Sequence, residues 1–302
     1  MARPAIIDVK MHGLHGLTAA FLVGGDQTAL IETGPKSSVD HVLAGLADHD
    51  IESLDWIVVT HIHLDHAGAA GTLARRFPDA RVAVHPLGAL HLIDPSKLWA
   101  SAARIYGDEM DSLWGGIDPI DESRIHIVED GDSIDLGGRR LRAVETPGHA
   151  RHHHSLLDDS TGIVFVGDAL GVRLQDVGIV RPATPPPEFH FEDAIHSIAR
   201  IAELDAESAW LTHFGPADEG VSPQSIDEVC DAATASLITW EEWVREGRAT
   251  TTDPDEVTRH VRHRARNALE GTVSPEGLDR LEHTTSYRMN VSGYMRYLDK
   301  ND

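Results

Sequence analysis

Four side chains that can bind a metal ion fall within six consecutive residues, in the pattern H-x-H-x-D-H. They are His61, His63, Asp65 and His66, and they follow a short apolar run that is typical of a buried strand. Alternate residues of an extended segment point to the same side, so His61 and His63 can grip one ion. Asp65 and His66 lie where the chain turns into a predicted helix, and they can face a second ion. Imidazole and carboxylate donors suit zinc, iron or manganese, so the pattern predicts a transition-metal site.

Three further candidate ligands share one feature, which is that each follows a predicted strand. They are His149 after 140–145, Asp168 after 162–166 and His213 after 208–211. α/β proteins place their sites where strands end, so we expect these side chains to join the same site.

The complete pattern resembles the metallo-β-lactamase superfamily, whose signature is H-x-H-x-D-H followed downstream by His, Asp and His. The resemblance covers about residues 5–220. It implies an α/β fold, the αββα sandwich of that superfamily, with two bound metal ions. The implied ligands are His61, His63 and His149 for the first ion, Asp65, His66 and His213 for the second, and Asp168 as the bridge.

The segments 93–99 and 147–153 narrow the resemblance to a prokaryotic branch of hydrolases, distantly like glyoxalase II and lactonases. Zinc is the expected metal, and iron or manganese stays open. Two such ions lower the pKa of a bound water to about 7 and polarise the bond under attack. Asp65 and Asp168 are the expected catalytic carboxylates, and Asp168 is expected to accept the proton of the nucleophile.

The expected reaction is hydrolysis of a carboxylic ester or lactone, with phosphoesters and thioesters left open. Two residues are candidates to support a ligand histidine: Glu32, through the other ring nitrogen, and His153. Three aromatic residues are candidates for a substrate pocket, or for ordinary packing: Trp99, Tyr106 and Trp114. Two other functions also stay open, a mononuclear-iron persulfide dioxygenase and a non-catalytic binding protein. A flavodiiron oxidoreductase is disfavoured, since that group usually has Glu where His63 stands.

The elements that must position these residues can be read from the apolar periodicity. Strands are predicted at 21–23, 28–31, 56–59, 81–84, 124–128, 133–136, 140–144, 155–157, 162–166 and 208–211, with helices at 38–49, 67–76, 95–115 and 191–204. From about residue 221 the pattern is helical, which predicts a catalytic domain over 1–220 and a helical C-terminal extension over 221–302, packed on that domain. Three pairs of a capping residue and proline predict helix starts: Ser222-Pro223, Asp253-Pro254 and Ser274-Pro275.

The composition restricts the partners of the protein. The formal charge of −23 disfavours binding to nucleic acid and leaves a small-molecule substrate as the expected partner. The single cysteine, Cys230, excludes an internal disulfide and a cysteine-type zinc site. No apolar run reaches about 18 residues and the N-terminus lacks the apolar region of a signal peptide, so a cytoplasmic protein that does not span a membrane is expected. A homodimer is left open.

Overall fold

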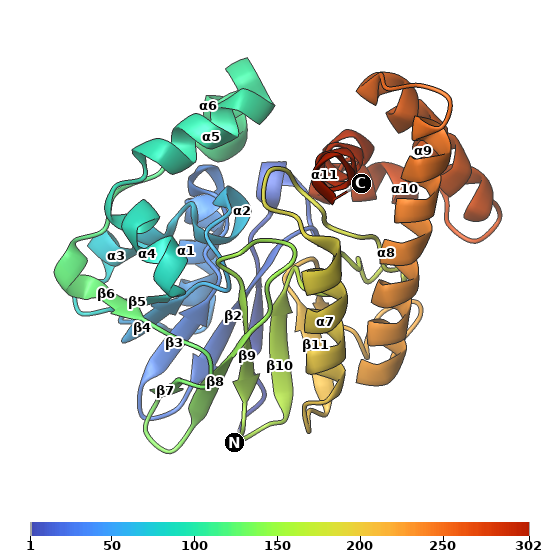
Figure 1. Ribbon diagram of the computed structural model, residues 1–302. Coiled ribbons are helices and arrows are strands. Elements are labelled where there is room, and N and C mark those ends of the chain that lie inside the picture. Colours follow the sequence, from blue (N-terminus) through green and yellow to red (C-terminus); the bar gives the residue numbers. More distant parts are fainter. Residues whose placement is uncertain (1, 302) are drawn as a thin grey trace. The chain divides into compact units, whose positions relative to one another are not determined.

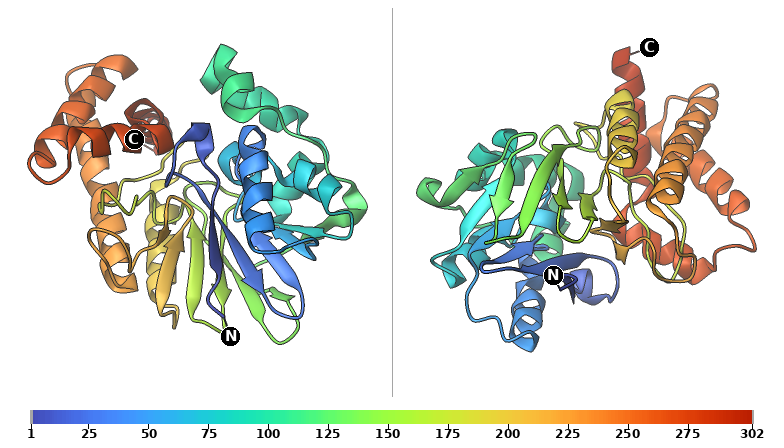
Figure 2. Two further views of the ribbon diagram at one scale, coloured as in Figure 1. Left: turned by 180° about the vertical axis from the view of Figure 1, so that it is seen from behind. Right: turned by 90° about the horizontal axis from the view of Figure 1, so that it is seen from below.

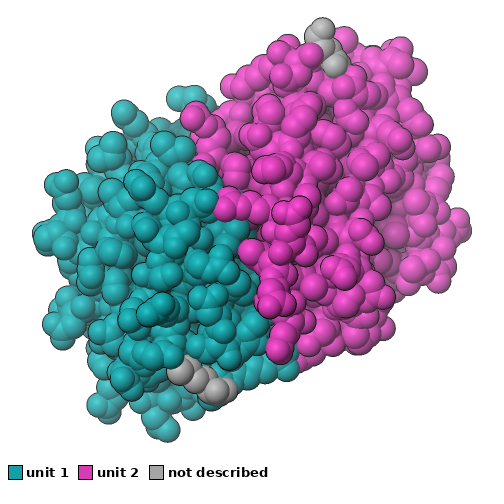
Figure 3. All heavy atoms as spheres, turned by 60° about the horizontal axis from the view of Figure 1, so that its bottom comes forward, with its two compact units in different colours: residues 1–145, 152–165 teal, residues 146–151, 166–302 magenta. Residues whose placement is uncertain are grey.

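The computed structural model describes residues 2–301 and divides into two compact units. Unit 1 comprises residues 1–145 and 152–165, and unit 2 comprises residues 146–151 and 166–302 (Figure 3). Each unit is built from elements that are distant in sequence, because the segment 146–151 groups with the C-terminal half of the chain.

The first sheet lies wholly in unit 1 and is mixed. Its order is β1-β2-β3-β4-β5-β6, with antiparallel pairs from β1 to β3 and parallel pairs from β3 to β6 (Figure 1). The strands are β1 (Ala5–Asp8), β2 (Ala19–Gly24), β3 (Thr28–Ile31), β4 (Trp56–Val58), β5 (Arg81–Val84) and β6 (Ile125–Ile127). The predicted hairpin of β2 and β3 is confirmed, whereas β1 carries too short an apolar pattern to have been predicted.

Helices cover one face of this sheet. They are α1 (Val39–Asp48), α2 (Leu64–Ala67), α3 (Ala70–Arg76) and α4 (Pro86–Ile93). Two further helices, α5 (Ser96–Tyr106) and α6 (Met110–Trp114), follow in sequence, and α5 packs against α4. Short 3₁₀ turns are η1 (Met11–Gly13), η2 (Lys36–Ser38), η3 (Gly107–Glu109) and η4 (Glu122–Arg124). Leu46 of α1 and Leu73 of α3 join Leu30 and Ile57 of the sheet in one buried cluster, so burial of apolar area fixes the helices on the sheet.

The second sheet has the order β12-β11-β10-β9-β8-β7, and the boundary between the units passes through β10. Its strands are β7 (Ser133–Asp135), β8 (Arg140–Glu145), β9 (His154–Asp158), β10 (Ile163–Gly167), β11 (Ser208–Leu211) and β12 (Gly215–Pro216). Within unit 1 this sheet faces the first one, because the rings of Phe21 on β2 and Phe165 on β10 are 5.1 Å apart. Two packed sheets with helices match the predicted αββα sandwich.

Unit 2 contributes a helical layer (Figure 2). Its helices are α7 (Phe191–Ala202), α8 (Ile226–Arg248), α9 (Pro254–Ala268), α10 (Pro275–Thr284) and α11 (Tyr287–Asn301). Within the unit, α8 packs against α7, α9, α11 and β11. The C-terminal region is helical as predicted, while the domain boundary near residue 220 stays a prediction.

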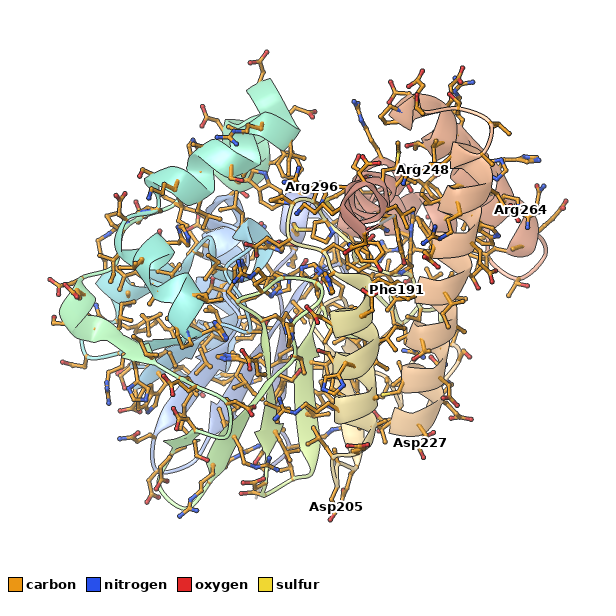
Figure 4. All side chains as sticks on the ribbon, viewed as in Figure 1. Phe191, Asp205, Asp227, Arg248, Arg264 and Arg296 are labelled. Atoms are coloured by element: carbon orange, nitrogen blue, oxygen red, sulfur yellow. The ribbon has the colours of Figure 1, made fainter. Side chains whose placement is uncertain are left out.

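Two of the three predicted helix starts are confirmed, and one is wrong. Asp253 and Ser274 cap α9 and α10. The long helix α8 does not start at Ser222, because Ser225 caps it and forms a reciprocal capping box with Glu228. Figure 4 labels Asp227 in the first turn of α8 and Arg248 at its last residue, where their charges suit the two ends of the helix dipole.

None of the helices over residues 2–301 is both long enough and apolar enough to cross a membrane.

His154 on β9 gives the stability of unit 1 a pH dependence. It is buried and its Nε2 donates to the carbonyl oxygen of Val59 at 3.0 Å. Burial, with the nearby His85, lowers its pKa to about 4. The folded protein therefore binds fewer protons at this site than the unfolded chain between pH 6.5 and 4. The contribution of His154 to stability is complete above pH 6.5 and falls by roughly 3 kcal/mol as the pH drops to 4.

We therefore expect His154→Gln to flatten the pH dependence of the free energy of unfolding, measured by urea titration at pH 7, 5.5 and 4.5. The exposed His41 is the matched control, and His41→Gln should leave the slope unchanged. Equal slopes for wild type and His154→Gln would contradict the account.

Candidate metal centre

The H-x-H-x-D-H segment spans the turn after β4 and the short helix α2, which contains Asp65 and His66. The strand β4 is buried and pairs in parallel with β3 and β5. The segment therefore follows the carboxyl end of a parallel strand. His61 and His66 are buried, while His63 and Asp65 are half-buried. The Nε2 atom of His61 lies 3.0 Å from Nδ1 of His63, so the two imidazoles converge as the alternation of side chains predicts.

Glu32 holds the ring of His66 in place from the end of the neighbouring strand β3. Its carboxylate is fully buried, and Oε1 lies 3.1 Å from Nδ1 of His66. The hydroxyl of Thr60 donates to the same oxygen at 2.5 Å and lies 3.1 Å from Nδ1 of His61. Both histidines thus have Nδ1 engaged, which leaves each Nε2 as the nitrogen that would bind a metal ion. Sequence reasoning included Glu32 and missed Thr60, whose side chain carries no distinctive spacing.

Replacing Glu32 with glutamine should weaken metal binding. The amide keeps the volume of the side chain but loses the charge that holds the His66 imidazole, and losses of about 10- to 100-fold in metal affinity are usual for such partners. Competition with a chromophoric chelator measures the change. The exposed Glu52 provides the matched control, Glu52→Gln. If both variants bind metal like the wild type, Glu32 does not support the ligand.

The histidines that follow His149 in sequence are buried in unit 1. The ring of His153 lies 4.9 Å from that of His61 and that of His152 lies 6.1 Å from it in a stacked orientation. His152 also accepts from the backbone N–H of Ile62 at 3.5 Å. Both rings lie next to the ring of His61, so the structure places His153 beside a predicted ligand.

Unit 2 carries the other three predicted ligands, which are His149, Asp168 and His213, with Asp168 next to both histidines. One carboxylate oxygen, Oδ2, lies 3.5 Å from Nε2 of His149, and the other, Oδ1, lies 3.6 Å from Nε2 of His213. All three side chains are more than nine-tenths buried. Each carboxylate oxygen of Asp168 thus faces a different imidazole, which is compatible with the bridging role that the resemblance implies.

Backbone contacts fix His149 and the loop that carries it. Nδ1 of His149 donates to the carbonyl oxygen of Ala183 at 2.8 Å, which leaves Nε2 toward Asp168. Gly148 has φ +125°, and a Cβ there would lie 2.3 Å from the backbone nitrogen of Ala194 on α7. Only glycine allows the helix to approach this loop so closely. A backbone carbonyl such as that of Ala183 leaves no mark in the sequence, so its role could not be predicted.

A small cavity of about 10 Å³ lies beside this group and is lined by His149, Asp168 and apolar residues of α7 and α8. That volume is about the space of one water molecule.

The donor set fits divalent metal ions. The predicted ligands are imidazoles and carboxylates, and three of the imidazoles, those of His61, His66 and His149, are positioned by a partner at Nδ1. The chemistry is that of zinc, iron or manganese rather than of calcium or magnesium, which prefer oxygen ligands.

The three aromatic pocket candidates lie on the segment that follows α4. Trp99 is half-buried on α5. The rings of Tyr106 and Trp114 contact each other edge to face at 5.0 Å, so packing accounts for part of their role. Burial raises the pKa of Tyr106, and the charge of Asp65 raises it further. Tyr106 therefore lies near a predicted ligand with its hydroxyl protonated.

The comparisons with known proteins agree with this site. The sequence profile of the Metallo-beta-lactamase superfamily matches residues 14–213, and the chain belongs to that superfamily. It is 33% identical over 216 residues to ST1585 of Sulfurisphaera tokodaii, covering 70% of this chain and 76% of that protein. The crystal structure of ST1585 superposes with a TM-score of 0.67 at 26% identity, covering 92% of this chain and 93% of the other.

Two relatives with activities in their names are matched over shorter stretches. Coenzyme F420H(2) oxidase of Methanothermobacter marburgensis is 29% identical over 56% of this chain and 40% of its own length. Hydroxyacylglutathione hydrolase of Vibrio cholerae is 30% identical over 47% of this chain and 42% of its own length. The chain spans less than half of these two relatives, and the superfamily includes both hydrolases and oxidases. The donor set and the family together imply divalent metal ions.

Proposed function

We propose that the protein is a binuclear metal-dependent hydrolase that cleaves an ester-type bond in a small molecule, with a carboxylic ester or lactone as the first choice. Phosphoesters and thioesters are the next candidates. Zinc is the proposed metal and the cytoplasm the proposed compartment. The proposed ligands are His61, His63, Asp65, His66, His149, Asp168 and His213. The observation that carries the proposal is the carboxylate of Asp168, which presents one oxygen to each of two imidazoles.

Metal ions at such a site supply a Lewis acid and an activated water near neutral pH. The residues of the chain then have three tasks. The imidazoles and Asp65 hold the ions, Glu32 fixes the ring of His66, and Asp168 is proposed to take the proton that the attacking water loses. This division needs no covalent intermediate on the protein.

Tyr106 is the proposed hydrogen-bond donor to the substrate. Because its pKa is raised, the hydroxyl keeps its proton at the pH where hydrolysis would occur. Its position near Asp65 suits a donor to the carbonyl oxygen of an ester or lactone, where negative charge develops.

The residue at position 63 supports hydrolysis over the oxidase chemistry named for one relative. His63 is an imidazole that converges with His61. The flavodiiron oxidoreductases, which the sequence disfavours, usually have Glu at this position, so their ligand set differs from this one.

Elemental analysis of the purified protein, paired with a substrate panel, tests the proposal. The panel contains a lactone, a carboxylic ester, a thioester and a phosphoester at equal concentration. Two zinc or manganese ions per chain with turnover of the lactone or ester is the expected result. One iron per chain, with oxygen uptake when a persulfide is added, would overturn the hydrolase proposal in favour of a persulfide dioxygenase. Fully metal-loaded protein that turns over nothing in the panel would favour a binding protein.

A further inference from the structure

A second pocket lies among the C-terminal helices of unit 2. It has a volume of about 240 Å³ and is bounded by α8, α9, α10, the start of α11 and the segment 179–181. Its walls are mainly apolar and include Ala232, Ala235 and Trp240 on α8 and Leu278 and Leu281 on α10. None of the predicted metal ligands lines it. A mostly apolar pocket with a few polar groups is the usual form of a small-molecule site.

One charged side chain, Arg181, lines this pocket. It is only 3% exposed, and its guanidinium lies 3.9 Å from the centre of the Tyr287 ring and 5.2 Å from that of Trp240. The two rings stack on each other at 5.3 Å, so they form one aromatic surface beneath the cation. A cation over aromatic rings is stabilised there, but the rings do not satisfy its N–H groups.

The hydrogen bonds of Arg181 are incomplete. Nη2 donates to Oε1 of Glu282 at 2.5 Å. Within residues 2–301, Nε and Nη1 are buried and make no hydrogen bond. A buried donor without a hydrogen bond destabilises the folded protein, and a charged group does so more strongly. A guanidinium in this state has two donors available for an anion.

The surrounding charges leave the pocket positive, although the whole chain carries a charge of −23. Glu282 is shared, because its other oxygen lies 3.9 Å from Arg262. Arg262 also lies over the ring of Tyr287 at 5.4 Å. Two guanidinium groups thus share one carboxylate. Burial raises the pKa of Tyr287, so that residue adds no negative charge.

We propose that this pocket binds a small carboxylic acid with an apolar body. The carboxylate accepts a hydrogen bond from Nη1 of Arg181, and the hydrocarbon or aromatic body packs along Ala232, Ala235 and Trp240. A hydrogen bond between a guanidinium and a carboxylate is charge-assisted, so it is shorter and stronger than one between neutral groups. The site is separate from the metal centre in composition and does not depend on the proposed hydrolase activity.

Isothermal titration of the metal-loaded protein with octanoate tests the proposal, with 1-octanol as the neutral probe of equal length. Octanoate should bind at least about tenfold more tightly than octanol, because octanol has no carboxylate and cannot form the charge-assisted pair with Arg181. Ala235→Phe fills the pocket from an exposed position on α8, and it should weaken octanoate binding at least about tenfold. Arg181→Met should do the same. Ile238→Phe adds an aromatic ring to the same helix outside the pocket, and it should leave binding unchanged.

Ala235→Phe keeps the test decisive even if Arg181→Met fails to fold. Octanoate binding that Ala235→Phe leaves unchanged would place the ligand elsewhere, for example on the metal ions, and would overturn the proposal. Equal affinity for octanol and octanoate would show that Arg181 takes no part, and would overturn it too. Absence of octanoate binding at millimolar concentration would have the same meaning.

Discussion

Alanine at position 168 should abolish turnover and reduce the metal content of the protein. The carboxylate of Asp168 faces His149 with one oxygen and His213 with the other, so one substitution removes a ligand from both proposed ions. It also removes the proposed proton acceptor. Several kcal/mol of transition-state stabilisation depend on such a centre, so the expected loss in kcat/KM is about 10³-fold or more.

Steady-state kinetics on the best substrate of the panel, together with elemental analysis of the same sample, measures both effects. Asp205 provides the matched control, since it is exposed in the loop between α7 and β11 (Figure 4). Asp205→Ala should retain the rate and the metal content of the wild type. A normal rate in Asp168→Ala would refute the bridging role.

The largest expected effect on stability comes from a buried ion pair in unit 1. Nε of Arg139 donates to Oδ2 of Asp158 at 3.0 Å, and both side chains are almost wholly buried. The same guanidinium donates through Nη1 to the carbonyl oxygen of Gly24 at 2.9 Å, which joins the end of β2 to the second sheet. Removing one partner of a buried pair leaves an uncompensated charge and costs about 3–5 kcal/mol.

Asp158→Ala should therefore lower the free energy of unfolding by about 3–5 kcal/mol in urea titrations. The adjacent Asp159 is 44% exposed and pairs with Arg142 at 3.5 Å, so Asp159→Ala should cost about 1 kcal/mol or less. The double variant Arg139→Met/Asp158→Leu should recover much of the loss, because no buried charge remains. Equal losses for Asp158→Ala and Asp159→Ala would contradict this account.

Much of the fold could be predicted from local patterns. The strand Arg81–Val84 and the helices α1, α7, α9 and α10 follow from apolar periodicity and capping residues, which act over a few residues. The start of α8 was misplaced because Ser222-Pro223 and Ser225 both offer a plausible cap. In the structure Ser225 caps the helix, because its side chain and that of Glu228 each accept a hydrogen bond from the other residue's backbone N–H.

The candidate site likewise contains some residues that could be predicted from the sequence and others that could not. Its metal ligands could be predicted because their types and order are unusual, and Glu32 because of its place at the end of a strand. The hydroxyl of Thr60 and the carbonyl of Ala183 could not be predicted, since their roles arise only when distant segments meet. The pocket around Arg181 is of that kind as well, because its lining residues are spread over more than one hundred positions of the chain.

Metal stoichiometry tests the central claim most directly. Elemental analysis of purified, folded protein should find two divalent transition-metal ions per chain, and His213→Ala should retain about one of them, because it removes a ligand of the second ion alone. A correctly folded preparation that binds no transition metal, or a His213→Ala variant that still holds two ions, would contradict the account.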